Sequence, residues 1–185
     1  MRILALLALS LLGACGGASQ PKTDAGCHRS ASHDIIWSNP RAPDVVTARA
    51  EGPSCAQAIV TLAIRDARGD PLWAFAATHF AMQAGEGALP EAAPAVSDDA
   101  MDAFLSNWAN LTIQKSTTLP QWREGDARLT GETFSYHTDF DRDAYEMLRT
   151  RDLPMICYAA GVETVACLVV DPFSHAPAQI VAYGP

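Results

Sequence analysis

The chain has 185 residues, of which 49% are hydrophobic and 18% are charged, and its formal net charge at pH 7 is −8. An acidic chain without a basic stripe repels phosphate backbones, which argues against nucleic-acid binding. After the amino terminus, no apolar run reaches the roughly 18 residues of a transmembrane helix. A chain of this size buries about 70% of its unfolded surface, so we expect a single globular domain over residues 27–185.

The amino terminus has the three parts of a secretory signal peptide. Arg2 supplies a positive charge, residues 3–12 form an apolar run, and the small residues Gly13 and Ala14 follow. The run is too short to span a bilayer, for which about 20 residues are needed. This order of features predicts that residues 1–14 are removed during export.

The residues Leu12-Gly13-Ala14-Cys15 resemble the lipobox of bacterial lipoproteins. The resemblance covers these four residues and the apolar run before them, and it implies a processing route without implying a domain family. The route is cleavage before Cys15, a diacylglyceryl thioether on its sulfur, and a further acyl chain such as palmitate on the new amino terminus. Two or more chains make a stable membrane anchor, because each buried methylene contributes about 0.8 kcal/mol. The alternative is ordinary signal cleavage nearby, with an incidental Cys15.

The residues around Cys15 also predict where the protein is anchored. Gly16 occupies the position at which some enteric lipoproteins carry an aspartate that retains them in the inner membrane. By that resemblance we expect an anchor in the outer membrane, facing the periplasm of the cell envelope. Residues 15–26 are mostly small, polar and rich in breakers, which is typical of a flexible tether.

The first part of the domain has the pattern of β-strands. Residues 57–65 alternate, which places three aliphatic side chains on one face, namely Val60, Leu62 and Ile64. Residues 66–71 have the composition of a type I turn in which Gly69 supplies a positive φ, so a hairpin is expected. Further strands are expected at 33–37 (an edge strand), 45–50 and 72–80. In the last of these, His79 shares a face with two aromatic residues, Trp73 and Phe75, and we expect a half-buried histidine there.

The centre of the chain predicts a loop followed by a helix. Residues 83–96 show no period and are rich in alanine, glycine and proline, so we expect a loop. Ser97 has the position of a helix N-cap, and Asp98 and Asp99 follow it at the positive end of the helix dipole. The helix carries a single apolar stripe, as does a helix that lies on a sheet: Met101, Phe104, Leu105 and Trp108.

The last part of the chain mixes helix and strand. A second helix is expected at 139–149, where four side chains would be buried: Phe140, Ala144, Met147 and Leu148. Short strands are expected at 111–113, 155–160, 164–170 and 180–183, whereas residues 117–133 show no clear pattern. Because strands and helices do not alternate regularly, the sequence predicts an α+β fold, an antiparallel sheet of about five to seven strands with two helices packed on it.

Besides the lipobox cysteine, the chain has four cysteines, an even number that predicts two disulfides in an exported domain. Three pairings are open. Local geometry favours Cys157–Cys167, because the turn at 161–163 would place these residues opposite each other in a hairpin. Cys27–Cys55 would then be the second bridge. Free buried thiols are the alternative, and zinc is disfavoured because no Cys-x-x-Cys or paired histidine spacing is present.

The densest polar cluster contains three carboxylates spaced by two residues, Asp139, Asp141 and Asp143. This spacing resembles the start of a calcium loop, but Ala144 replaces the required glycine and Thr150 replaces the bidentate glutamate. The reading that we favour is a helix amino terminus enriched in acids, which complement the helix dipole. His137 with Asp139 also has the residue types of a base and its orienting group, although no nucleophile motif accompanies them.

Trp122 lies in a polar, turn-rich segment. It is either an exposed anchor for a partner or glycan, or an aromatic folded back over the core. Since no catalytic motif is present, we expect a non-catalytic binding module, anchored in the membrane through Cys15, whose partner is an envelope protein or a glycan. No cofactor is indicated. The alternative is a periplasmic hydrolase or metal-assisted enzyme that uses three residues of the polar cluster, His137, Asp139 and Asp143.

Overall fold

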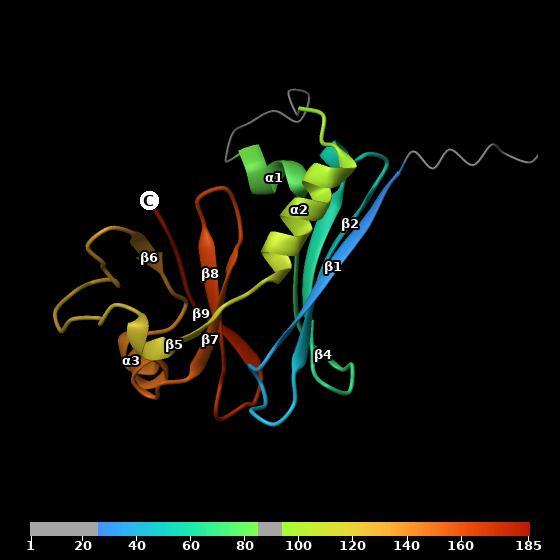
Figure 1. The fold of residues 1–185 in the computed structure, drawn as a ribbon. Helices are drawn as coiled ribbons and strands as arrows, with labels where there is room; N and C mark the ends of the chain where they lie inside the picture. Colours follow the sequence, from blue (N-terminus) through green and yellow to red (C-terminus); the bar gives the residue numbers. More distant parts are fainter. Residues whose placement is uncertain (1–25, 85–93) are drawn as a thin grey trace, which may run out of the picture.

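A computed structural model of the chain describes residues 26–84 and 94–185. The signal peptide, Cys15, most of the tether and the centre of the predicted loop lie outside these ranges. The described residues form two antiparallel sheets and three helices, where the sequence predicted one sheet of five to seven strands with two helices. The mixed α+β class is therefore confirmed, and the single sheet is wrong. Figure 1 shows the two sheets next to each other, with α2 beside β1 and β2.

The amino-terminal sheet has the strand order β1-β2-β3-β4. Its strands are β1 (Cys27–Ile35), β2 (Asp44–Gly52), β3 (Ile59–Arg65) and β4 (Pro71–Thr78). The predicted face of β3 is confirmed, because three alternate side chains are completely buried, those of Val60, Leu62 and Ile64. The edge strand predicted at 33–37 begins six residues later than β1 and ends two residues after it. The length of β1 is set by its pairing with all nine residues of β2, which the local apolar pattern does not reveal.

The hairpin between β3 and β4 is confirmed, together with its glycine. Asp66 closes the turn, since its carbonyl accepts a hydrogen bond from the Gly69 amide at 2.8 Å. The Asp66 side chain accepts from the amides of Arg68 and Asp70, both at 2.9 Å. Gly69 has a φ of +88°, a backbone conformation that glycine adopts without steric cost.

The strand predicted at 72–80 ends two residues early, because a helix begins there. Thr78 Oγ1 accepts a hydrogen bond from the Ala81 amide at 3.0 Å, which caps the short helix α1 (His79–Ala84). His79 therefore lies on a helix, and the prediction that it shares a strand face with aromatic residues is wrong. Its backbone amide donates to the Ala58 carbonyl at 2.9 Å, which holds α1 against the start of β3.

Helix α2 (Asp98–Ala109) has the predicted cap and the predicted stripe. Ser97 Oγ accepts a hydrogen bond from the Ala100 amide at 3.2 Å. The buried side chains of the stripe pack into the core over the amino-terminal sheet, namely Met101, Leu105 and Trp108. At the edge of this contact, Arg29 of β1 forms an ion pair with Asp102 at 2.8 Å. Arg29 also lies 3.5 Å from Asp98, so the helix is fixed to β1 by apolar packing and by two charged contacts.

The carboxy-terminal sheet has the strand order β5-β7-β8-β9-β6. Its strands are β5 (Ile113–Lys115), β6 (Ser135–His137), β7 (Pro154–Ala159), β8 (Val165–Val170) and β9 (Pro177–Gly184). Consecutive residues of β7 and β8 are buried, and since neighbours in a strand point to opposite faces, both faces of these strands are covered. One face joins the core of the amino-terminal sheet through Ile156, Tyr158, Ala166 and Leu168. The other face forms a second core with α3 through Met155, Cys167 and Val169.

The two edge strands of this sheet show where local pattern fails. The strand predicted at 111–113 instead occupies Ile113–Lys115, and β6 was not predicted at all. Both strands have three residues and are largely exposed, so they carry no apolar alternation. Their positions follow from backbone pairing with β7 and β9, as in the pair Tyr136↔Tyr183.

Helix α3 (Arg142–Thr150) begins three residues later than predicted. Thr138 Oγ1 accepts from the Phe140 amide and donates to the Ile180 carbonyl, which keeps the preceding segment out of the helix. Asp141 is the N-cap, and its side chain accepts from the Ala144 amide at 2.8 Å. The predicted buried stripe is wrong in part, because Met147 is 36% exposed whereas Tyr145 is completely buried.

Both predicted disulfides are present. Cys27–Cys55 joins the start of β1 to the 3-10 turn η1 (Cys55–Gln57), and Cys157–Cys167 joins two residues directly opposite each other in β7 and β8. Of the three pairings that the sequence left open, the one favoured by local geometry is therefore confirmed.

The two bridges should differ in how much they stabilise the fold. In the chain-entropy description, a bridge over a separation of 28 residues stabilises by about 3.5 kcal/mol and one over 10 residues by about 2.7 kcal/mol. We expect the double Cys27→Ala and Cys55→Ala variant to lose more unfolding free energy than the double Cys157→Ala and Cys167→Ala variant. Urea unfolding followed by circular dichroism measures both, and the reverse order would contradict the entropic explanation.

Candidate functional site

The predicted polar cluster lies at the surface, around the start of α3. His137 Nε2 is 3.3 Å from Asp139 Oδ1, but the two side chains are 76% and 87% exposed. Asp141 caps the helix, and Asp143 contacts the neighbouring Arg142 at 3.5 Å. In residues 26–84 and 94–185, no three histidine, cysteine, aspartate or glutamate side chains lie close enough together to hold a metal ion. Of the cluster, Asp141 and Asp143 lie at the amino terminus of α3, whereas His137 ends β6 and Asp139 precedes the helix.

Trp122 is folded over the second core. Its ring meets that of Tyr145 edge to face, with the centroids 6.1 Å apart. The indole Nε1 donates to the Asp126 carbonyl at 3.1 Å, and the backbone amide of Trp122 donates to Glu146 Oε1 at 2.6 Å. Glu146 in turn accepts from Arg149 at 2.8 Å. Because its N–H is engaged within the chain and its ring packs against Tyr145, Trp122 lies partly buried against the second core.

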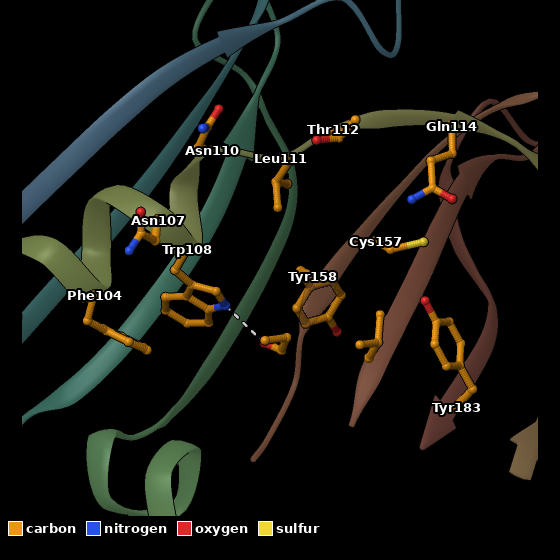
Figure 2. Close-up of a pocket in the computed structure, with 12 residues that line it drawn as sticks. Phe104, Asn107, Trp108, Asn110, Leu111, Thr112, Gln114, Cys157, Tyr158 and Tyr183 are labelled. Atoms are coloured by element: carbon orange, nitrogen blue, oxygen red, sulfur yellow. Dashed lines mark hydrogen bonds between the residues drawn. The ribbon is translucent and has the colours of Figure 1, made fainter. Parts of the chain in front are cut away.

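The structure shows a cleft that the sequence did not predict. It lies between the last turns of α2, the segment that connects α2 to β5, and the edge of β7, and its volume is about 490 Å³ (Figure 2). In Figure 2 the Gln114 amide and the Tyr183 hydroxyl point toward Cys157, and the Trp108 and Tyr158 rings lie on the side nearer α2. Its main side chains come from α2, the connecting segment, β5, β7 and β9, namely Asn107, Trp108, Thr112, Gln114, Tyr158 and Tyr183.

The cleft exists because β5 covers only part of the edge of β7. The pairing runs from Lys115↔Pro154 to Ile113↔Ile156, and the chain then leaves the sheet toward α2. At the other end of β7, Trp108 Nε1 donates to the Ala159 carbonyl at 2.9 Å. The cleft is thus bounded by the end of β5 on one side and by the indole on the other.

Aromatic packing holds the indole and the floor of the cleft in place. The Trp108 ring lies edge to face against Phe75 of β4, with centroids 6.1 Å apart, and the Tyr158 ring lies 4.6 Å from that of Trp73. Trp108 and Tyr158 are only 5% and 4% exposed. Burial raises the pKa of Tyr158 to about 12, so its hydroxyl is neutral at physiological pH. A site that is preformed in this way loses little conformational entropy when a ligand binds.

The lining of the cleft is uncharged. None of its twelve residues is acidic, basic or histidine, although the whole chain carries a formal charge of −8. Its polar groups are amides and hydroxyls, which both donate and accept hydrogen bonds, as in Asn107, Gln114 and Thr112. Burial, with the nearby Tyr136, raises the pKa of Tyr183, so this hydroxyl is also neutral. The site therefore suits an uncharged ligand that hydrogen-bonds.

His79 lies outside the cleft, in the core beside α2. Its ring meets Phe104 edge to face at 5.0 Å, and the residue is 7% exposed. Burial disfavours the charged imidazolium and lowers the pKa of His79 below its ordinary value of 6.5. The sequence predicted a half-buried histidine on a strand, whereas His79 is almost fully buried and is carried by helix α1.

Comparisons with protein-family models, curated proteins and solved structures find no match to this chain. Among the described residues, no helix is long and apolar enough to cross a membrane. The amino-terminal motif and the geometry of the cleft are the features of the chain that bear on its function.

The buried His79 makes the stability of the protein depend on pH. Its pKa is lower in the folded chain than in the unfolded chain, so the unfolded chain binds more protons below about pH 6.5 and stability falls as the pH is lowered. We expect urea unfolding at pH 7 and pH 5 to show a loss of stability that shrinks in His79→Phe. His33→Phe controls for the removal of an imidazole, and an unchanged pH dependence in His79→Phe would refute the assignment.

Proposed function

We propose that this protein is a lipid-anchored binding module of the bacterial cell envelope, and that the cleft beside α2 is its ligand-binding site. The envelope assignment rests on the lipobox-like residues that end at Cys15 and on the two disulfides, which are typical of exported proteins. The single observation that carries the binding assignment is the cleft itself, which is preformed, uncharged and lined by convergent amides and hydroxyls over an aromatic floor.

The alternative function, a periplasmic hydrolase, has one observation in its favour, the 3.3 Å contact between His137 and Asp139. A hydrolytic base needs a nucleophile or a positioned water and a site that limits solvent. Both side chains are more than three-quarters exposed, and neither lines the cleft. The contact is weak support for catalysis, and we place the binding function first.

The anchor can be tested at Cys15. Replacing Cys15 with serine removes the only sulfur that the lipobox could modify, so lipid attachment should be lost. We expect wild-type protein to incorporate labelled palmitate and to sediment with membranes, and the Cys15→Ser variant to do neither. A Cys15→Ser protein that still fractionates with membranes would remove the basis for the anchor.

The cleft can be tested by filling it. Gln114 is exposed and lines the cleft, so Gln114→Trp should block the site without disturbing the core. Gln57→Trp is the matched control, because Gln57 is also exposed and lies on η1, outside the cleft. Saturation-transfer NMR with two uncharged probes, diacetylchitobiose and blocked Val/Thr peptides, should show binding that weakens at least tenfold in Gln114→Trp and changes less than twofold in Gln57→Trp. Binding that is unchanged in Gln114→Trp would exclude the cleft as the binding site.

A further inference from the structure

We propose that the ligand of the cleft is an extended, uncharged polypeptide segment that adds to the open edge of β7 as an antiparallel strand. This inference rests on the proposed binding function and names its ligand class. An added strand recognises a partner mainly through backbone hydrogen bonds, and the pockets beside it select side chains. In this mode the peptide would continue the line of β5 along β7, between Ile156 and the Trp108 indole.

The backbone groups of Cys157 point into the cleft. Cys157 and Cys167 are directly opposite each other and their Cα atoms are 4.0 Å apart. In an antiparallel pair, a distance near 4.5 Å marks residues that do not share hydrogen bonds, whereas hydrogen-bonded residues are about 5.5 Å apart. The amide and the carbonyl of Cys157 therefore point away from β8, toward the edge that faces the cleft.

A second observation supports the same direction for the backbone groups of Cys157. The Ala159 carbonyl accepts the hydrogen bond of Trp108 Nε1 from the cleft side. Residues two apart in a strand direct their backbone groups to the same edge, so Cys157 and Ala159 both face the cleft. The edge thus offers the Cys157 amide, the Cys157 carbonyl and the Ala159 amide, in the spacing that an extended peptide requires.

The space beside this edge is open because β5 ends early. After the pair Ile113↔Ile156, the next residue in line with Cys157 on that side is Thr112, and it is not part of the strand. No strand of the described ranges pairs with this edge of β7 beyond Ile156. The open length, from Cys157 to Ala159, corresponds to about 10 Å of added strand.

The surroundings favour a peptide over a glycan. Sugars usually stack on exposed aromatic faces, but the Trp108 and Tyr158 rings are at least 95% buried, so they support the cleft without offering a platform. Gln114 and Asn107 supply amides that match the polar groups of a peptide chain. A charged side chain would lose water here without gaining an opposite charge, so the partner segment should be uncharged.

The walls of the cleft favour a single chain as its occupant. Free strand edges risk pairing with other sheets, and proteins protect them by covering them. Here the indole of Trp108 closes one end, and the connection from α2 to β5, through Leu111 and Thr112, lines the side of the cleft. One extended segment can enter this space, whereas the edge of another folded sheet would meet these walls.

The test uses the full chain purified in detergent and a panel of acetylated, amidated pentapeptides built from Val, Ile, Thr, Tyr and Gln. Fluorescence polarisation identifies the tightest member, which is then remade with a single N-methyl group at each position in turn. In an added strand, alternate peptide amides point to the Cys157 side and the others point away. We expect N-methylation to weaken binding at least tenfold at alternate positions and less than twofold between them.

A second readout comes from the protein. Cysteine labelled with ¹⁵N marks the Cys157 amide, whose proton resonance should move downfield when it donates to the peptide, whereas that of Cys27 should stay in place. The Gln114→Trp variant should lose both the binding and the shift.

Every other outcome would refute a specific part of the proposal. N-methylation effects that do not alternate, with Gln114→Trp still blocking the peptide, would refute strand addition and leave the cleft as the binding site. Binding of diacetylchitobiose but of no pentapeptide below 1 mM would make the ligand a glycan and refute the peptide. Binding of neither probe in the wild type would refute the strand-addition proposal and the proposed binding function together.

Discussion

The rest of the structure depends on β7 and β8 being buried on both faces. An antiparallel sheet often has one face in water, but here one face packs on the amino-terminal sheet and the other on α3. A slip of one residue between the two strands would exchange the side chains of the two cores. The bridge between Cys157 and Cys167 joins directly opposed residues and so fixes the register at the centre of the sheet.

The amino-terminal sheet buries one face only, and two different elements share it. Helix α2 covers the part near β1 and β2, and the carboxy-terminal sheet covers the part near β4 through Tyr158. Trp108 lies where these coverings meet, with its ring in the core and its N–H on the Ala159 carbonyl. A buried indole needs a partner for its N–H, and this need sets the distance between α2 and β7. The cleft is the space that this distance leaves beyond the end of β5.

Local signals in the sequence predicted the local structure. The hairpin with Gly69, the cap at Ser97 and the stripe of α2 each depend on residues within one turn or one strand, and all are confirmed. The division into two sheets, the length of β1 and the existence of β6 depend on pairing between distant segments, which no local pattern contains. The disulfides were predictable because one hairpin brings its two cysteines together and leaves only two others.

The candidate site escaped prediction for a related reason. The densest polar cluster of the sequence, at 137–143, was expected mainly to be a helix amino terminus, and Asp141 does cap α3 there. The cleft contains no charged residue and no motif, and its parts come from α2, a connecting segment and four strands. Its distinctive groups are the backbone atoms of β7, which have no sequence signature. In an acidic protein, a ligand of such a neutral cleft would be selected by hydrogen-bond geometry and shape rather than by charge, and the groups that would select it come together only in the folded arrangement of β5, β7 and Trp108.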